Sequence, residues 1–268
     1  MLLIAIPLGL AIGLALGALG GGGSILAVPA LVYVLGQDPA TATTSSLVIV
    51  GVTAVIGMLP HARAGRVKFG QGLMFGLLGT FGSVVGSMFS VSVEPEVLLG
   101  AFAGLMLVVA LLMLRRAFSA QVKVVDPDLA AEPLLALDPF VCDCPRVIKV
   151  IVTATVVGML TGFFGVGGGF VVVPALVLAL GFSMPVAVGT SLVVIAVNSV
   201  TALASRVATG VGELDWAVIG VFAAAAVGGS LVGGKLTQRA NPRHLTAGFA
   251  VMLLAVAGYT AVQSWGLG

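Results

Sequence analysis

The sequence repeats itself, and each repeat carries a glycine run inside an apolar segment. Residues 20–29 read GGGGSILAVP and residues 165–174 read GVGGGFVVVP, so the glycines and the closing proline recur 145 positions later. At an offset of 147, GSVVG at residues 82–86 recurs as GSLVG at residues 229–233. Because self-similarity at a fixed offset marks duplicated structural units, the chain is predicted to fold as two copies of one unit.

Composition places both copies in a membrane. Of 268 residues, 59% are hydrophobic and 8% are charged, whereas soluble domains carry about 25% charged residues. We therefore predict an all-α polytopic membrane protein. Residues 1–116 form the first transmembrane repeat, residues 117–146 a linker, and residues 147–268 the second repeat. The first apolar block lacks a basic n-region, so we interpret it as a retained membrane segment. The net charge of +2 indicates no nucleic-acid partner.

Each copy contains five apolar helical elements. They are predicted at residues 2–19, 24–36, 40–60, 70–90 and 95–115, and at residues 147–164, 170–181, 185–205, 215–234 and 243–263. The last three of each copy reach the ~20 residues that span a bilayer core, and the second does not. Two arrangements satisfy these lengths: all five elements cross, or the first two form a re-entrant hairpin.

Basic residues give the orientation. Eleven of the twelve lysines and arginines lie in three regions: the loop after residue 60, the linker with its flanks, and the segment 235–243; the exception is Arg206. The positive-inside rule places these regions in the cytoplasm and the chain in the cytoplasmic (inner) membrane. Because the basic loop follows the third element in one copy and the fourth in the other, the copies are predicted to form an inverted repeat.

The glycine runs are candidate binding sites. Glycine weakens the helix, and Pro29 disfavours helical backbone at Val28, so each run is predicted to be unwound, with a helix starting near the proline. Free N–H groups beside a helix N-terminus form an anion site, which inverted-repeat transporters hold near the bilayer midplane. The predicted backbone ligands are Gly21, Gly22, Gly23, Ser24, Val166, Gly167, Gly168 and Gly169. Alternatively, the glycines only permit close helix packing, as expected for the GxxxG patterns in the fourth elements.

The third elements add side chains to this site. Thr44 and Ser45 in one copy, and Thr190 and Ser191 in the other, are candidate ligands for substrate oxygens. Asn198 and Thr201 follow further along the second of these helices. Alternatively, such hydroxyls bond only to their own helix backbone.

His61 and Arg206 occupy equivalent positions at the ends of the third elements. No charged residue lies securely within the predicted bilayer core, although proton-coupled transporters commonly use intramembrane carboxylates or histidines. A histidine titrates near neutrality, so His61, with Arg206 and Asn198, is a candidate for coupling or gating. The alternative role for His61 is that of an interfacial residue.

Cys142 and Cys144 form a CxC pair at the end of the linker. In the cytoplasm both thiols stay reduced, and such a pair binds a soft metal or reacts with a sulfur compound. Two cysteines do not complete a tetrahedral zinc site. With two histidines, no phosphate loop and no HExxH segment, the sequence predicts no enzyme, no cofactor and no metal.

Together, the duplicated glycine runs that end in PAL, the TSSL and TSLV segments and the basic loops resemble the TauE/SafE family of sulfite exporters over essentially the whole chain. The resemblance implies a transporter that exports sulfite, sulfoacetate or related organosulfonates, with protons as a possible coupling ion. We therefore expect a secondary transporter that works by alternating access. The alternatives are a passive anion channel, or a membrane partner that delivers sulfur or metal through the CxC linker. The oligomeric state is not predicted.

Overall fold

The structure, a computed structural model, describes residues 2–90, 93, 95–118, 135–137, 140–142, 144–164, 169–209 and 214–264. Within them the chain is almost entirely helical, which confirms the predicted fold class. The first copy contains α1 (Leu2–Leu19), α2 (Gly22–Pro29), a π-helical turn η1 (Ala30–Val34), α3 (Pro39–Arg63), α4 (Phe69–Ser90) and α5 (Pro95–Phe118). The second contains α6 (Cys144–Phe164), α7 (Gly169–Leu178), α8 (Met184–Thr209), α9 (Trp216–Arg239) and α10 (Pro242–Ser264). Between the copies, β1 (Leu135–Leu137) and β2 (Phe140–Cys142) form an antiparallel hairpin.

Several helices begin where the sequence provides a cap. The Asp215 carboxylate accepts hydrogen bonds from the backbone N–H groups of Ala217 and Val218, at 3.0 and 3.1 Å, and so caps α9. Asp38 accepts from the backbone N–H of Thr41 at 3.4 Å before α3. Helices α3, α5 and α10 each start with proline, whose missing N–H has no helical partner at that position.

Among the described residues, five helices are long and apolar enough to cross a membrane: α3, α4, α5, α8 and α9. Large apolar side chains remain exposed on their outer faces, among them Phe81, Met88 and Val200 at 69%, 71% and 64% exposure. Such exposure is unfavourable in water and suits contact with lipid. The protein is therefore a multi-pass membrane protein.

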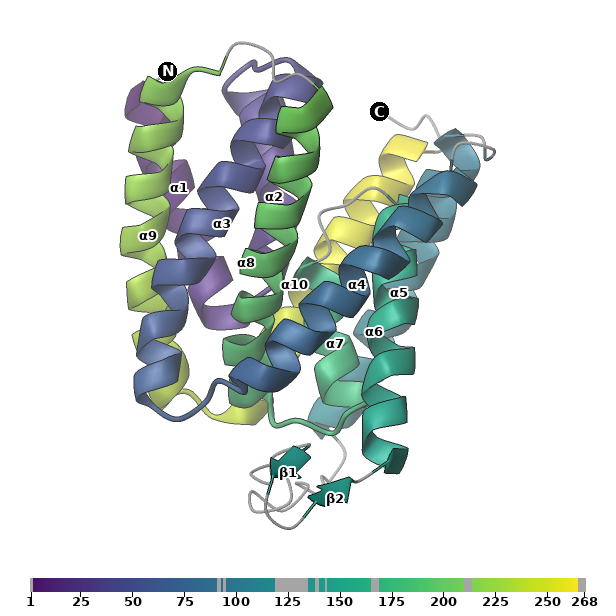
Figure 1. Ribbon diagram of the computed structural model, residues 1–268. Coiled ribbons are helices and arrows are strands. Elements are labelled where there is room, and N and C mark those ends of the chain that lie inside the picture. Colours follow the sequence, from purple (N-terminus) through teal and green to yellow (C-terminus); the bar gives the residue numbers. More distant parts are fainter. Residues whose placement is uncertain are drawn as a thin grey trace.

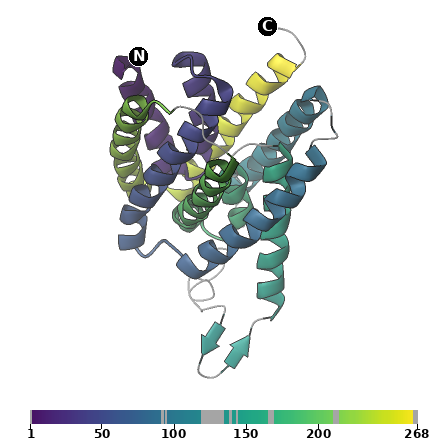
Figure 2. The ribbon, with the colours of Figure 1, turned by 45° about the horizontal axis from the view of Figure 1, so that its top comes forward.

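The basic loops gather at one end of the helices. Figures 1 and 2 show the α3–α4 loop near the same end as the β-hairpin, with the chain termini at the opposite end, and Figure 1 shows the α9–α10 loop beside them. We call the end with the hairpin the linker side and the opposite end the far side. Helices α3, α5 and α9 run toward the linker side, and α4, α8 and α10 run away from it (Figure 1).

Each long helix of one copy packs mainly on a helix of the other. Helix α3 packs on α8, α5 on α10, α1 on α9 and α6 on α4. The short helices α2 and α7 also contact each other, although α2 packs more extensively on α1 and α7 on α8. Exchanging the two copies reproduces this list, because first elements always meet fourth elements and the other elements meet their own counterparts.

Glycine brings the first and fourth elements together. A Cβ at Gly13 would overlap the backbone of Ala226, and one at Gly233 would overlap the backbone of Leu14, so α1 and α9 are in direct backbone contact. In the matching pair, Gly86 of α4 lies against the backbone of Met159 in α6. The interpretation of the GxxxG patterns as packing seams is confirmed.

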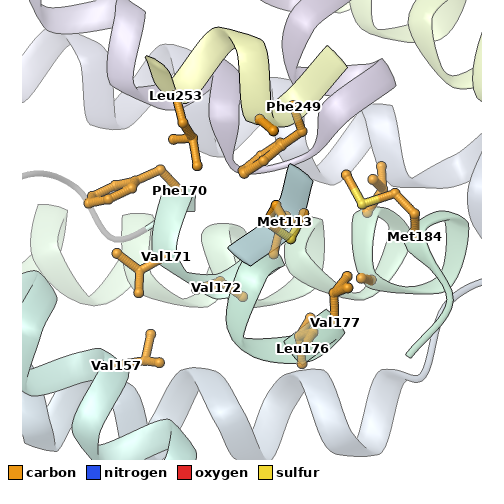
Figure 3. Close-up of a cluster of buried hydrophobic side chains, with 14 of the residues drawn as sticks. Met113, Val157, Phe170, Val171, Val172, Leu176, Val177, Met184, Phe249 and Leu253 are labelled. Atoms are coloured by element: carbon orange, nitrogen blue, oxygen red, sulfur yellow. The ribbon is translucent and has the colours of Figure 1, made fainter. Parts of the chain in front are cut away.

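The short helix α7 lies in the core of the half of the molecule that contains α5, α6 and α10. Phe170, Val171 and Val172 from α7 pack with Met113 from α5 and Phe249 from α10, all at most 5% exposed (Figure 3). A second core cluster, which includes Leu16, Leu31, Ile49, Leu192 and Phe222, joins α1, η1, α3, α8 and α9.

The second elements are helical from the glycines onward. Helix α2 begins at Gly22 and α7 at Gly169, with Pro29 and Pro174 inside the helices, so the predicted helix start near each proline is wrong. Pro29 instead lies at the change from α to π geometry, with a φ of −54° that suits both proline and a helix. The break lies before α2, where Gly20 has a φ of 70°.

Candidate functional site

Helices α2 and α7 begin against each other in the interior. A Cβ on Gly21 would overlap the backbone of Gly169, and one on Gly20 would overlap the Ser191 hydroxyl. Gly22 faces the Met252 side chain, and Gly23 faces the backbone of α1. All four glycines at 20–23 are buried and leave room for a neighbour, as the packing interpretation requires. Of the predicted backbone ligands, Val166, Gly167 and Gly168 lie outside the described residues, and the backbone anion site stays a prediction.

The predicted hydroxyl ligands around this contact have different partners. Ser24 donates to the carbonyl of Gly21 at 2.7 Å and Ser191 to that of Val188 at 2.8 Å, the local bonding expected of buried hydroxyls. Thr190 accepts a hydrogen bond from the backbone N–H of Lys68 at 3.2 Å. The buried hydroxyl of Ser45 has no hydrogen-bond partner among the described residues.

A cavity of about 360 Å³ lies between α3, α4, α6 and α8. Its lining is rich in hydroxyl groups, although the helices that form it are apolar. The lining residues are Thr43, Leu47, Thr80, Ser83, Val84, Ser87, Thr161, Gly162, Asn198, Ser199, Thr201, Ala202, Ser205 and Arg206. Polar groups in a membrane helix bundle are costly unless they line an aqueous path or contact one another, so this cavity is the leading candidate site.

Three polar side chains form the inner end of the cavity. The Thr80 hydroxyl lies 3.4 Å from the Asn198 side-chain oxygen and 3.4 Å from the Thr201 hydroxyl. Thr80 is near the middle of α4 and Asn198 near the middle of α8. The cavity therefore begins about halfway along these helices and extends toward Ser87 and Arg206, in the last turns before the far side.

Arg206 lies at the outer end of the cavity. Its guanidinium donates a hydrogen bond to the Thr44 hydroxyl on α3 at 3.2 Å. Among the described residues that line the cavity, it is the one that carries a charge. A half-buried guanidinium beside hydroxyl and amide groups is suited to hold a small oxyanion, because its N–H groups match pairs of anionic oxygens.

The structure thus brings together some of the predicted side chains and separates others. Asn198 and Arg206 line one cavity, and Thr44 contacts Arg206. Thr190 and Ser191 do not line it. Thr80, Ser83 and Ser87 were not predicted. Their spacing of three and four residues places three hydroxyls on one face of α4, a signal that the sequence contains.

His61 is buried at the linker-side end of α3. It is 0% exposed, and its Nε2 lies 3.0 Å from the carbonyl oxygen of Gly17 on α1. Its Nδ1 has no hydrogen-bond partner in the described part of the chain. Helices α1 and α9 cover His61, through Gly17 and Gly234, so its side chain is inside the bundle. Its equivalent, Arg206, lies at the opposite side of the bundle.

The CxC pair lies at the entry to the second copy. Cys142 ends β2 and Cys144 begins α6. Within the described ranges, no group of three or more histidine, cysteine, aspartate or glutamate side chains is placed to hold a metal ion.

Comparisons with known proteins agree with this architecture. The family Sulfite exporter TauE/SafE matches residues 5–260. A probable membrane transporter protein of Xylella fastidiosa (strain Temecula1) is 34% identical over 98% of this chain and 96% of its own length. The probable membrane transporter protein YunE of Bacillus subtilis is 29% identical over 94% of this chain and 93% of its own length. No solved structure matches the chain significantly. The chain belongs to the TauE/SafE sulfite exporter family of membrane transporters.

Proposed function

We propose that the protein is a secondary transporter that exports small sulfur-containing anions, such as sulfite or an organosulfonate, across the cytoplasmic membrane by alternating access. The observation that carries this proposal is the cavity between α3, α4, α6 and α8, with Arg206 at its outer end and Asn198 at its inner end. Membership of a family of sulfite exporters supports the substrate class.

The cavity chemistry fits an anion with several oxygens. Arg206 supplies positive charge and a fork of N–H donors, while the Asn198 amide and the Ser83 hydroxyl supply further donors. The hydroxyls of Thr80 and Thr201 donate to the carbonyls of Gly76 and Val197 in their own helices, so they offer the cavity their acceptor lone pairs. Because the surroundings are apolar, these interactions are stronger than they would be in water. A volume of about 360 Å³ holds such an anion with several water molecules.

The second glycine run provides candidates for additional backbone contacts. Thr161 and Gly162 line the cavity, and residues 165–168 follow Gly162 by three to six positions in the sequence. We propose that backbone N–H groups of Val166, Gly167, Gly168 and Gly169 contribute to the anion site, as the sequence predicts.

The transporter interpretation also rests on a difference between the two sides. The cavity extends toward the far side, to Ser87 and Arg206, whereas the equivalent positions toward the linker side, around His61 and Gly17, are in close contact. In an inverted repeat, exchanging the conformations of the copies would close the first region and open the second. We place the linker side in the cytoplasm, because the basic loops gather there. Protons are the proposed coupling ion.

Flux measurements on purified protein in liposomes test this function. We expect radiolabelled sulfite to be carried, to accumulate when a pH difference is imposed, and to be carried far more slowly by Arg206→Gln. Arg206→Lys is the matched control, because it keeps the charge and loses the planar fork. Sulfite movement that never exceeds equilibration under any pH difference would indicate a passive channel. The absence of sulfite and sulfonate flux in folded protein would contradict the assigned substrate class.

A further inference from the structure

The residues that line the cavity have sequence counterparts in the other copy, and these counterparts also lie together. At the offset of 145, Asn198 corresponds to Thr53, Arg206 to His61 and Gly162 to Gly17; at 147, Ser83 corresponds to Ser230. Nε2 of His61 is 3.0 Å from the Gly17 carbonyl oxygen. A Cβ on Gly17 would overlap the backbone of Ser230. The counterpart cluster is therefore assembled on α1, α3 and α9, toward the linker side.

This cluster is closely packed, yet two of its buried polar atoms have no partner in the described part of the chain. His61 and Ser230 are both 0% exposed. Nδ1 of His61 and the hydroxyl of Ser230 have no hydrogen-bond partner among the described residues. An unsatisfied buried polar group destabilises the fold, so both groups are available to bind a ligand from outside the chain.

In the counterpart cluster, glycines stand at positions where larger residues line the cavity, and polar side chains pack against these glycines. Gly57 corresponds to Ala202 and lies directly against the Ser230 side chain; Gly234 corresponds to Ser87 and lies near Nε2 of His61. These contacts between glycine and a polar side chain can separate without breaking apolar side-chain packing.

We propose that His61, Ser230 and Thr53 form a second anion-binding half-site, which opens toward the linker side when the Arg206 cavity closes. It would receive the same oxyanion through the imidazole N–H and the Ser230 hydroxyl. Thr53, whose hydroxyl donates to the Ile49 carbonyl at 2.6 Å, would line the half-site as Asn198 lines the cavity. This inference rests on the proposed transport function and adds the linker-side binding residues. It also gives the unpartnered groups a role, because they become ligands in the linker-side-open state.

Paired cysteine variants test the proposal independently of transport. Ser83→Cys and Ser230→Cys occupy equivalent positions and would be made with Cys142 and Cys144 replaced by serine. Membranes of either orientation would be treated with an impermeant maleimide, with methanesulfonate on one side or the other. We expect Ser83→Cys to react from the far side and Ser230→Cys from the linker side. When methanesulfonate is supplied on the opposite side of the membrane, the labelling rates of the two cysteines should change in opposite directions.

Two labelling results would overturn the proposal. One is a Ser230→Cys thiol that never reacts from the linker side, although it reacts fully after denaturation. The other is simultaneous reaction at both positions with no reciprocal change, as an open pore would give. Reciprocal labelling without any sulfite or sulfonate flux would support the half-site as a sulfonate-binding site and contradict the proposed transport of these anions.

A second variant separates binding from packing. Ser230→Ala removes a hydroxyl that has no partner among the described residues, so the fold should be no less stable. We expect its KM for substrate on the linker side to rise roughly tenfold, as for loss of a hydrogen bond to a charged group, with the KM on the far side unchanged. Thr246→Val is the control, because that hydroxyl bonds to the Pro242 carbonyl of its own helix. Equal KM values for Ser230→Ala and the parent protein on both sides would contradict the half-site.

Discussion

The guanidinium of Arg206 on α8 donates a hydrogen bond of 3.2 Å to the hydroxyl of Thr44 on α3. This bond joins the third elements of the two copies and holds a cation at the outer end of a cavity lined by hydroxyl groups. Its counterpart at the linker side is the contact between His61 and the backbone around Gly189. The α3–α8 pair therefore carries a nitrogen-containing side chain at each end: Arg206 toward the far side and His61 toward the linker side.

Removing the cation should weaken anion binding. We expect Arg206→Gln to raise the KM for the transported anion by about 10- to 100-fold, because a hydrogen bond to a charged group contributes about 1.5–3 kcal/mol. Arg206→Lys should lie between this variant and the parent protein. The measurement is the initial rate of flux against anion concentration in liposomes, and a KM equal to that of the parent for both variants would exclude Arg206 from the site.

At the inner end of the cavity, loss of the Thr80 hydroxyl should reduce transport more than loss of its methyl group. Thr80→Val keeps the volume and removes the hydroxyl that lies 3.4 Å from Asn198, whereas Thr80→Ser keeps the hydroxyl. We expect flux to fall about tenfold in the valine variant, the effect of leaving polar neighbours without a partner, and to be largely kept in the serine variant. If both variants behave alike, the hydroxyl does not contribute to transport.

Replacing a glycine with alanine should destabilise the protein where that glycine contacts the backbone of another helix, and should have little effect elsewhere. Gly13→Ala introduces a Cβ against the backbone of Ala226 and should destabilise the protein by about 1–3 kcal/mol, the usual cost of overpacking. Gly220→Ala on α9 is the matched control: a Cβ there meets no atom within 4 Å. In detergent, the midpoint of thermal unfolding should be lower for Gly13→Ala than for the parent protein, and it should not decrease for Gly220→Ala.

The predicted backbone anion site can be tested without disrupting the fold at Gly22. A Cβ there would meet the flexible end of Met252, which can move, whereas one at Gly21 would meet the backbone of Gly169. If backbone around the first glycine run contacts the anion, Gly22→Ala should reduce flux at unchanged protein level. Unchanged flux in this variant would leave close packing as the role of these glycines.

The linker thiols report the orientation. We expect Cys142 and Cys144 to react with an impermeant maleimide only in inside-out vesicles, since the basic loops indicate a cytoplasmic linker side. The double serine variant should keep full transport. Labelling from the outside of intact cells would reverse the assigned orientation, and lost transport with normal folding would support delivery through the CxC pair.

Helix positions followed closely from the sequence, because apolar segment lengths and capping residues such as Asp38 and Asp215 act locally. The pairing of α1 with α9, and of α4 with α6, was not predicted. It depends on contacts between glycines of one copy and the backbone of the other, which the sequence of one segment does not reveal. The start of α2 at Gly22 was not predicted, since proline was taken as a helix start although its φ also suits a helix interior that widens after it.

The candidate site followed from the sequence only in part. Arg206 and Asn198 were predicted as candidates for coupling or gating together with His61, and the structure places both in the lining of the cavity. Ser83 lies within the GxxxG pattern at residues 82–86, and the hydroxyl face that it shares with Thr80 was not predicted. Burial of His61 depends on α1 and α9, so its own segment gave no indication of it.

Protection of Ser83→Cys from maleimide by methanesulfonate tests the central claim most directly, because Ser83 lines the cavity and methanesulfonate carries the sulfonate oxygens without consuming the reagent. In protein with Arg206 present, we predict that labelling from the far side slows as methanesulfonate is added and that sodium chloride at equal ionic strength does not reproduce the effect. With Arg206→Gln, the protection should require far higher concentrations. A labelling rate that is unaffected by methanesulfonate in both backgrounds would contradict the assignment of this cavity as the anion site.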